Sequence, residues 1–217
     1  MASAGEIKIR IGSIRQTKKV TDAMYMISSV KMRRAKREVE STKPYFRALK
    51  EQIGELFLYI PETDNRYFRL PLPEGQIHRR RGILLVTSDK GLAGAYNQTA
   101  IKEAEAYMHR HPETFLFIVG ECGRQYFLSK KIPYETGFTY SAAFPTVWEA
   151  RKICTDLLEY YDGGRLDEID IIYTDYHNGR PSECKRNCLL PLEQSRFFSP
   201  DRHEDPQNRE FYPDPNT

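Results

Sequence analysis

Residues 7–60 read IKIRIGSIRQTKKVTDAMYMISSVKMRRAKREVESTKPYFRALKEQIGELFLYI, and one heptad repeat runs through the whole stretch. Positions spaced alternately four and three residues apart form a seam, and most of them are apolar. A seam of this length is typical of one strand of a coiled coil. The sequence therefore predicts a long helix over residues 1–60, and no second heptad run follows to pair with it. The seam residues expected to contact a partner helix include Ile7, Ile11, Ile14, Met32, Ala35 and Val39.

A proline interrupts this stretch at position 44. A proline inside a helix loses one backbone hydrogen bond and clashes with the preceding turn, which costs about 3 kcal/mol. The seam nevertheless keeps its phase from Val39 to Phe46. We therefore expect either a kink or a restart of the helix capped by Ser41 or Thr42, and not the end of the helix.

A second apolar stripe lies between Val20 and Val30, on roughly the opposite face from the seam. A helix that is apolar nearly all round is expected to be buried all round, so we predict that a larger partner encloses this segment. The alternative is an ordinary packed helix with a solvated charged side. The residues expected to contact the enclosing partner are Lys18, Lys19, Val20, Ala23, Met24, Ile27, Val30 and Lys31.

Charge is distributed unevenly along the 217 residues, whose net charge is +3. Residues 1–60 hold thirteen Lys and Arg against six Asp and Glu, a net of +7, so the remainder carries −4. A basic rod of this kind suggests an acidic partner surface, with nucleic acid as the alternative. No signal peptide, transit peptide or membrane-spanning run is visible. The four cysteines are expected to be reduced thiols of a cytosolic protein, with a redox role for Cys184 and Cys188 left open.

The remainder of the chain alternates short apolar runs with amphipathic segments, which predicts an α/β domain with a mostly parallel, Rossmann-like sheet. We expect a linker over residues 61–81, the α/β domain over 82–198 and a polar tail over 199–217. The basic run 78–81 is interpreted as a solvated loop. The predicted strands are 83–87, 115–119, 169–173 and 188–194, with a short one at 132–134, and the predicted helices are 95–109, 124–129 and one from 145 to 161.

No catalytic, cofactor or metal site is evident in the sequence. The segment from Gly91 to Gly94 follows a strand and precedes a helix, a position that can hold a phosphate. It lacks the phosphate-loop and dinucleotide-binding motifs, so we favour glycines that permit a tight turn. The histidines show no metal-ligand spacing, and no nucleophile is paired with a base.

Several motifs are distinctive: the sequence from Ile14 to Met24, Lys31-Met32, Lys43-Pro44-Tyr45, the loop from Ser88 to Asn97, Leu189–Leu192 and Phe211–Pro215. Together they closely resemble the γ subunit of F-type ATP synthases. The loop motif comprises Asp89, Lys90, Gly91, Leu92, Gly94 and Asn97. The family loop usually reads Gly-Leu-Cys-Gly-Gly, and here Ala93 and Ala95 take the places of Cys and the last Gly.

The resemblance implies a non-catalytic rotor in the central stalk, which couples ion flow through the membrane sector to ATP synthesis or hydrolysis. The first helix would be half of an antiparallel coiled coil inside the ring of α and β subunits, facing an acidic loop of the β subunits. The domain would meet the ε subunit and the c-ring, at the cytoplasmic face of the cell membrane, with no cofactor and no nucleic acid. Family members continue past the Pro-Asp-Pro at residues 213–215 with a second long helix, so we expect this chain to lack that helix, as a fragment or a shortened paralogue.

Two other functions remain possible from the residues alone. A nucleic-acid-binding protein could use the basic helix, although the two apolar stripes leave little free basic face. An adaptor derived from the γ subunit could have lost the rotor role. The coupling ion and the direction of operation are not predicted.

Overall fold

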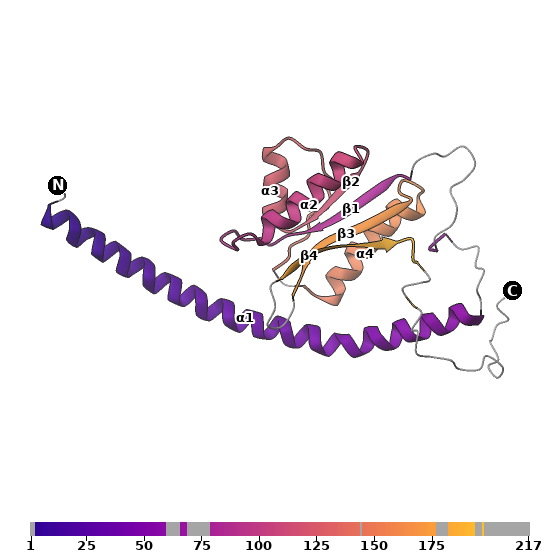
Figure 1. The fold of residues 1–217 in the computed structure, drawn as a ribbon, viewed down its shortest axis with the longest axis horizontal. Helices are drawn as coiled ribbons and strands as arrows, with labels where there is room; N and C mark the ends of the chain where they lie inside the picture. The colour runs from indigo at the N-terminus through magenta and orange to yellow at the C-terminus, as the bar shows by residue number, and fades with distance from the viewer. Residues whose placement is uncertain are drawn as a thin grey trace. The chain divides into compact units, whose positions relative to one another are not determined.

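The structure is a computed structural model in which residues 3–59, 66–68, 79–143, 145–176, 182–193 and 197 are described, with the side chains of 56–59 left aside. The chain divides into two compact units. One comprises Met1–Pro61 and Phe197–Thr217, and the other comprises Glu62–Arg196. The first unit contains helix α1, and the second contains a four-stranded sheet with three helices (Figure 1).

Helix α1 spans Ala4–Tyr59 and is 56 residues long. At about 1.5 Å per residue it measures roughly 80 Å. It begins with a reciprocal cap: the Glu6 backbone N–H donates to the Ser3 hydroxyl at 3.2 Å, and the Ser3 N–H donates to the Glu6 carboxylate at 2.8 Å. The predicted long helix is confirmed.

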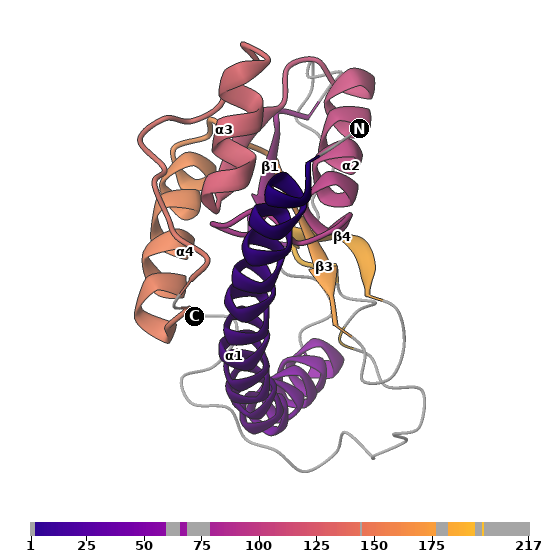
Figure 2. The ribbon, with the colours of Figure 1, turned by 90° about the vertical axis from the view of Figure 1, so that its left-hand side faces the viewer.

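The helix is continuous through Pro44, so the predicted restart at Ser41 or Thr42 is wrong. Both hydroxyls donate backwards to the Glu38 carbonyl, that of Ser41 at 2.8 Å, and neither accepts from a following turn as a cap would. The helix instead bends along its length, as its two ends in Figure 2 show.

The sheet has the strand order β2-β1-β3-β4. Strand β1 (Arg81–Val86) pairs in parallel with β2 (Phe115–Val119) and with β3 (Glu168–Asp175). Strand β4 (Glu183–Leu190) pairs with β3 in the antiparallel direction. The predicted α/β domain with a mostly parallel sheet is confirmed.

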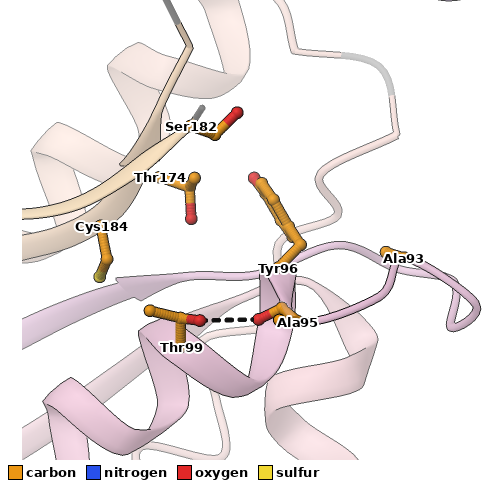
Figure 3. Close-up of a pocket in the computed structure, with 7 residues that line it drawn as sticks. All are labelled: Ala93, Ala95, Tyr96, Thr99, Thr174, Ser182 and Cys184. Atoms are coloured by element: carbon orange, nitrogen blue, oxygen red, sulfur yellow. Dashed lines mark hydrogen bonds between the residues drawn. The ribbon is translucent and has the colours of Figure 1, made fainter. Parts of the chain in front are cut away.

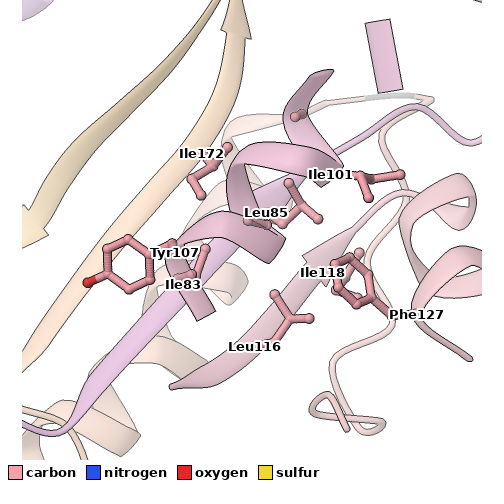
Figure 4. Close-up of a cluster of buried hydrophobic side chains, with 10 residues drawn as sticks. Ile83, Leu85, Ile101, Tyr107, Leu116, Ile118, Phe127 and Ile172 are labelled. Atoms are coloured by element: carbon pink, nitrogen blue, oxygen red, sulfur yellow. The ribbon is translucent and has the colours of Figure 1, made fainter. Parts of the chain in front are cut away.

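Helices cover both faces of the sheet. On one face, α2 (Tyr96–Arg110) and α3 (Glu121–Ser129) pack on a core that includes Ile83 and Leu85. Figure 4 shows this core between α2 and the strands. On the other face, α4 (Val147–Asp162) packs with Leu84, Phe117 and Leu166. Successive β1 residues therefore point to opposite cores, as expected for a strand that is buried on both faces.

Three sequence predictions differ from the structure. Strand β4 begins and ends earlier than the predicted 188–194, because its edge sequence ECKRNCLL is polar and half-exposed and has no apolar run to mark it. Residues 132–134 form no strand; the Ile132 N–H closes the end of α3 by donating to the Phe127 carbonyl at 3.0 Å. Residues 79–81, the part of the basic run that the structure describes, are not a solvated loop, because Arg81 belongs to β1 and Arg80 pairs with the Asp167 carboxylate at 2.8 Å. The turn predicted at Asn178–Gly179 lies outside the described residues.

Candidate partner-binding helix and the loop at residues 88–97

The seam of α1 is exposed at the six positions predicted to contact a partner helix. The large seam residues Ile7, Ile11, Ile14, Met32 and Val39 are between 46% and 61% exposed, and Ala35 is exposed as well. Apolar surface in water is unfavourable by about 25 cal/mol per Å². A row of exposed apolar side chains of this length is typical of a surface that another molecule covers.

The second stripe is exposed too. Val20, Met24, Ile27 and Val30 are between 50% and 59% exposed, and Ala23 is also exposed. Helix α1 thus presents apolar side chains on two faces over residues 20–32, and the structure brings all the residues predicted to contact the enclosing partner onto three to four consecutive turns. Whether a partner covers them stays a prediction.

Basic side chains frame this segment. Lys18, Lys19 and Lys31 are exposed. Further along the helix, Arg34 pairs with Glu38 at 2.8 Å and Lys36 lies 3.9 Å from Glu40. Exposed pairs one turn apart contribute only a few tenths of a kcal/mol. The net positive charge of the helix therefore remains available to attract an acidic surface.

The loop motif is built around the carboxylate of Asp89. It accepts hydrogen bonds from the Ser141 hydroxyl at 2.6 Å, the Ala142 N–H at 3.0 Å and the Glu121 N–H at 3.1 Å. Burial alone would raise the pKa of Asp89, but the hydrogen bonds outweigh it and lower the pKa below its ordinary value. Asp89 therefore joins the β1–α2 loop to the start of α3 and to residues 141–142. The sequence marked Asp89 as a motif residue but carried no signal for these partners.

A second bonded pair closes the loop. The buried Asn97 side chain accepts from the Ser88 N–H at 2.9 Å and donates to the Ser88 hydroxyl at 2.8 Å. That hydroxyl also donates to the Lys90 carbonyl at 2.7 Å. The polar residues of the motif thus hold the loop in place.

The exposed part of the loop has an unusual backbone. Leu92 and Gly94 both adopt left-handed conformations, with φ of 60° and 58°. Gly94 is suited to this geometry, whereas a leucine adopts it only at a cost of about 1–2 kcal/mol. Leu92 is also 96% exposed. Of the two glycines in the predicted turn, Gly94 therefore has the left-handed backbone that favours glycine, within a connection that runs from Val86 to Tyr96.

A cavity of about 320 Å³ lies beside the first turn of α2. Figure 3 shows its lining, which combines alanine methyl groups with the hydroxyls of Tyr96, Thr99, Thr174 and Ser182 and the thiol of Cys184. None of the described lining residues is Lys or Arg, the side chains that usually hold phosphate.

Two other features bear on function. Within the described ranges no three His, Cys, Asp or Glu side chains are grouped as metal ligands, and none of the described helices is long and apolar enough to cross a membrane.

His111 lies 3.1 Å from the Arg81 guanidinium, and burial together with that positive charge lowers the pKa of its imidazole. His111 thus lies beside the Arg81–Glu168 ion pair at the start of β1.

Comparisons with known proteins agree on one group. Residues 3–217 match a family model described as "ATP synthase". The ATP synthase gamma chain of Acetivibrio thermocellus is 33% identical over 193 residues, which cover 89% of this chain and 65% of that one. The gamma chain of Caldanaerobacter subterraneus is 36% identical, with 89% and 65% covered, and that of Moorella thermoacetica is 31% identical, with 90% and 68% covered. This chain thus spans about two thirds of the length of these relatives.

A solved structure shares the fold. The central stalk and c-ring structure of the Tetrahymena thermophila mitochondrial ATP synthase contains a chain that matches with a TM-score of 0.60 at 19% identity, covering 86% of this chain and 80% of that chain. At this identity the match shows the fold alone. It combines a long helix with an α/β domain, as found here.

Proposed function

Because the chain belongs to the family of ATP synthase gamma chains, we propose that it acts as a non-catalytic rotor subunit of the central stalk. In this role it couples ion flow through the membrane sector to ATP synthesis or hydrolysis in the ring of α and β subunits. The matched relatives are longer than this chain, so the proposal concerns the part of the rotor that this chain represents.

The observation that carries the proposal is the exposure of two apolar faces on one helix. Residues 20–32 of α1 place Val20 and Ile27 on one face and Met32 on the seam, all more than half exposed. One partner helix along the seam would leave the second face in water. A ring that surrounds the helix would cover both faces, and the seam would still accept a second helix.

The remaining assignments follow from the rotor role. Lys18, Lys19 and Lys31 would face an acidic loop of the β subunits, where complementary charge favours association and orientation. The α/β unit would contact the ε subunit and the c-ring. The protein would lie peripherally at the cytoplasmic face of the cell membrane and would bind no cofactor and no nucleic acid.

The test is assembly with α and β subunits of a bacterial relative. We expect the chain to co-purify with the ring, and we expect no ATP hydrolysis by the chain alone. The double variant Val20→Asp, Ile27→Asp should lose co-purification, since it places two carboxylates on the second face.

The matched control is Ser13→Asp, Gln16→Asp, which adds the same charge at exposed polar positions of the same helix. Loss of co-purification in both double variants would show that the two added negative charges prevent assembly wherever they lie on the helix. It would refute the role of the second stripe. Tight DNA or RNA binding that falls steeply with salt, without assembly into the ring, would favour the nucleic-acid alternative.

A further inference from the structure

The two units of the chain are joined at two places, at the boundaries Pro61/Glu62 and Arg196/Phe197. The described residues nearest to these boundaries within the α/β unit lie beside one another. Phe68 and Leu192 form a parallel β-bridge, and the Leu192 N–H donates to the Tyr67 carbonyl at 2.7 Å. Both connections are therefore attached to the α/β unit at the same point.

This point is bonded to the C-terminal end of α4. The Arg66 guanidinium donates to the Asp162 carbonyl at 2.7 Å and to the Tyr161 carbonyl, and it lies 5.0 Å from the centre of the Tyr161 ring. Carbonyls in the last turn of a helix have no partner within the helix and carry the negative end of its dipole. The planar fork of an arginine can satisfy two such carbonyls at once.

Tyr67 and Tyr161 extend the attachment. Their rings stack with centroids 6.0 Å apart at an angle of 17°. The Tyr67 hydroxyl lies 3.0 Å from both carboxylate oxygens of Asp162, and the Tyr161 hydroxyl donates to the Arg66 carbonyl at 2.5 Å. Tyr161 is itself buried in the core beneath α4. Segment 66–68 is thus fixed to a part of the unit that cannot move without disturbing the core.

We propose that this cluster is the mechanical anchor through which load passes between the two units of the chain. The inference rests on the proposed rotor function, in which torque must cross from the helix to the α/β unit. Load on the chain at residue 66 would pull on the end of α4 through several bonds at once, and the second connection at residue 192 shares the same attachment. The anchor consists of Arg66, Tyr67, Phe68, Tyr161, Asp162 and Leu192.

Hydrogen exchange of the full chain tests whether the cluster holds the two connections together. Arg66→Ala removes two hydrogen bonds from a charged donor. We expect the Leu192 amide to exchange about tenfold faster, which corresponds to a loss of about 1.4 kcal/mol from the state in which this amide is bonded to the Tyr67 carbonyl. Tyr67→Phe removes only a hydroxyl and should give a smaller increase while leaving the unit folded.

Two control variants match these changes elsewhere in the same unit. Arg165→Ala removes a guanidinium that lies 3.7 Å from the centre of the Tyr160 ring. Tyr126→Phe removes a hydroxyl that donates to the Glu105 carboxylate at 3.0 Å. Neither control should change exchange of the Leu192 amide, because neither side chain belongs to the anchor.

Pulling on single molecules tests the load path itself. One handle is attached to the exposed Cys154 on α4 and the other to α1 through Gln52→Cys, after replacement of the three half-buried cysteines by serine. At a fixed load we measure how long segment 66–68 stays bonded to the end of α4. This lifetime should shorten about tenfold in Arg66→Ala and should be unchanged in Arg165→Ala. An unchanged lifetime in Arg66→Ala and Tyr67→Phe would overturn the proposal. Pulling needs no assembled ring, so failure of the anchor is distinguishable from failure of the rotor assignment.

Discussion

Replacing Asp89 by asparagine should destabilise the α/β unit, because its carboxylate joins three parts of the fold. The carboxylate accepts hydrogen bonds from Ser141, Ala142 and Glu121 at 2.6–3.1 Å. A hydrogen bond to a charged group contributes about 1.5–3 kcal/mol, and competition from water at this half-buried site reduces the sum. Asparagine keeps an acceptor but removes the charge and places an amide donor against donors. We expect a loss of about 2 kcal/mol at pH 7, or roughly 8 °C in melting temperature.

The dependence on pH follows from the lowered pKa of Asp89. A carboxyl group whose folded pKa lies below its unfolded value of 3.8 contributes stability that is fully present above pH 3.8 and is lost as the pH falls through the folded pKa. The difference in unfolding free energy between wild type and Asp89→Asn should therefore be constant near neutral pH and shrink in acid. Urea unfolding of both proteins from pH 7 down to pH 3 measures it.

The control for this experiment is Glu113→Gln, which removes one negative charge at an exposed position in the turn before β2. It should change the unfolding free energy by less than about 0.5 kcal/mol. A difference for Asp89→Asn that stays the same down to pH 3, or that is no larger than in the control, would refute the argument that the ionised carboxylate holds the loop.

Four further substitutions have expected outcomes. Gly120→Ala should destabilise the unit by about 3–4 kcal/mol in urea unfolding, since its φ is 96° and a Cβ would lie 2.2 Å from the Thr87 carbonyl oxygen. Gly94→Ala should cost only about 1 kcal/mol, because no atom lies within 4 Å of the added Cβ. Equal costs for the two substitutions would contradict this reasoning. Phe127→Ala should cost about 3–5 kcal/mol by the same measurement, because the ring is fully buried between α3 and the sheet, and a cost below about 1 kcal/mol would mean that the core is not packed as described. Met24→Lys should leave the circular dichroism of the chain unchanged, because Met24 is 50% exposed. It should nevertheless lower the number of ions pumped per ATP in a complete complex. A variant that unfolds the chain while leaving pumping intact would refute the assignment of Met24 to the surface that the ring covers.

The local pattern of the sequence was sufficient to predict the helices and strands that have a strong hydrophobic period or a continuous apolar run. Helix α1 was predictable because its seam repeats over many turns, and a helix depends mainly on residues close in sequence. The strands around Ile83 and Phe117 were predictable because burial on both faces requires an unbroken apolar run. Strand β3 was predictable from its isoleucines and Tyr173, although Asp170 interrupts the apolar run. Strand β4 was misplaced because an edge strand with one solvated side needs no such run.

The sequence by itself determined the long helix with its two apolar stripes, the α/β class of the second unit and the family to which the chain belongs. Only the tertiary structure decided what Asp89 and Arg66 do. The partners of Asp89 lie 32 to 53 residues away, and those of Arg66 lie 95 and 96 residues away. A repeat or an apolar run reports how each residue relates to its neighbours along the chain, whereas these bonds exist because packing of the sheet and α4 brings distant segments within about 3 Å.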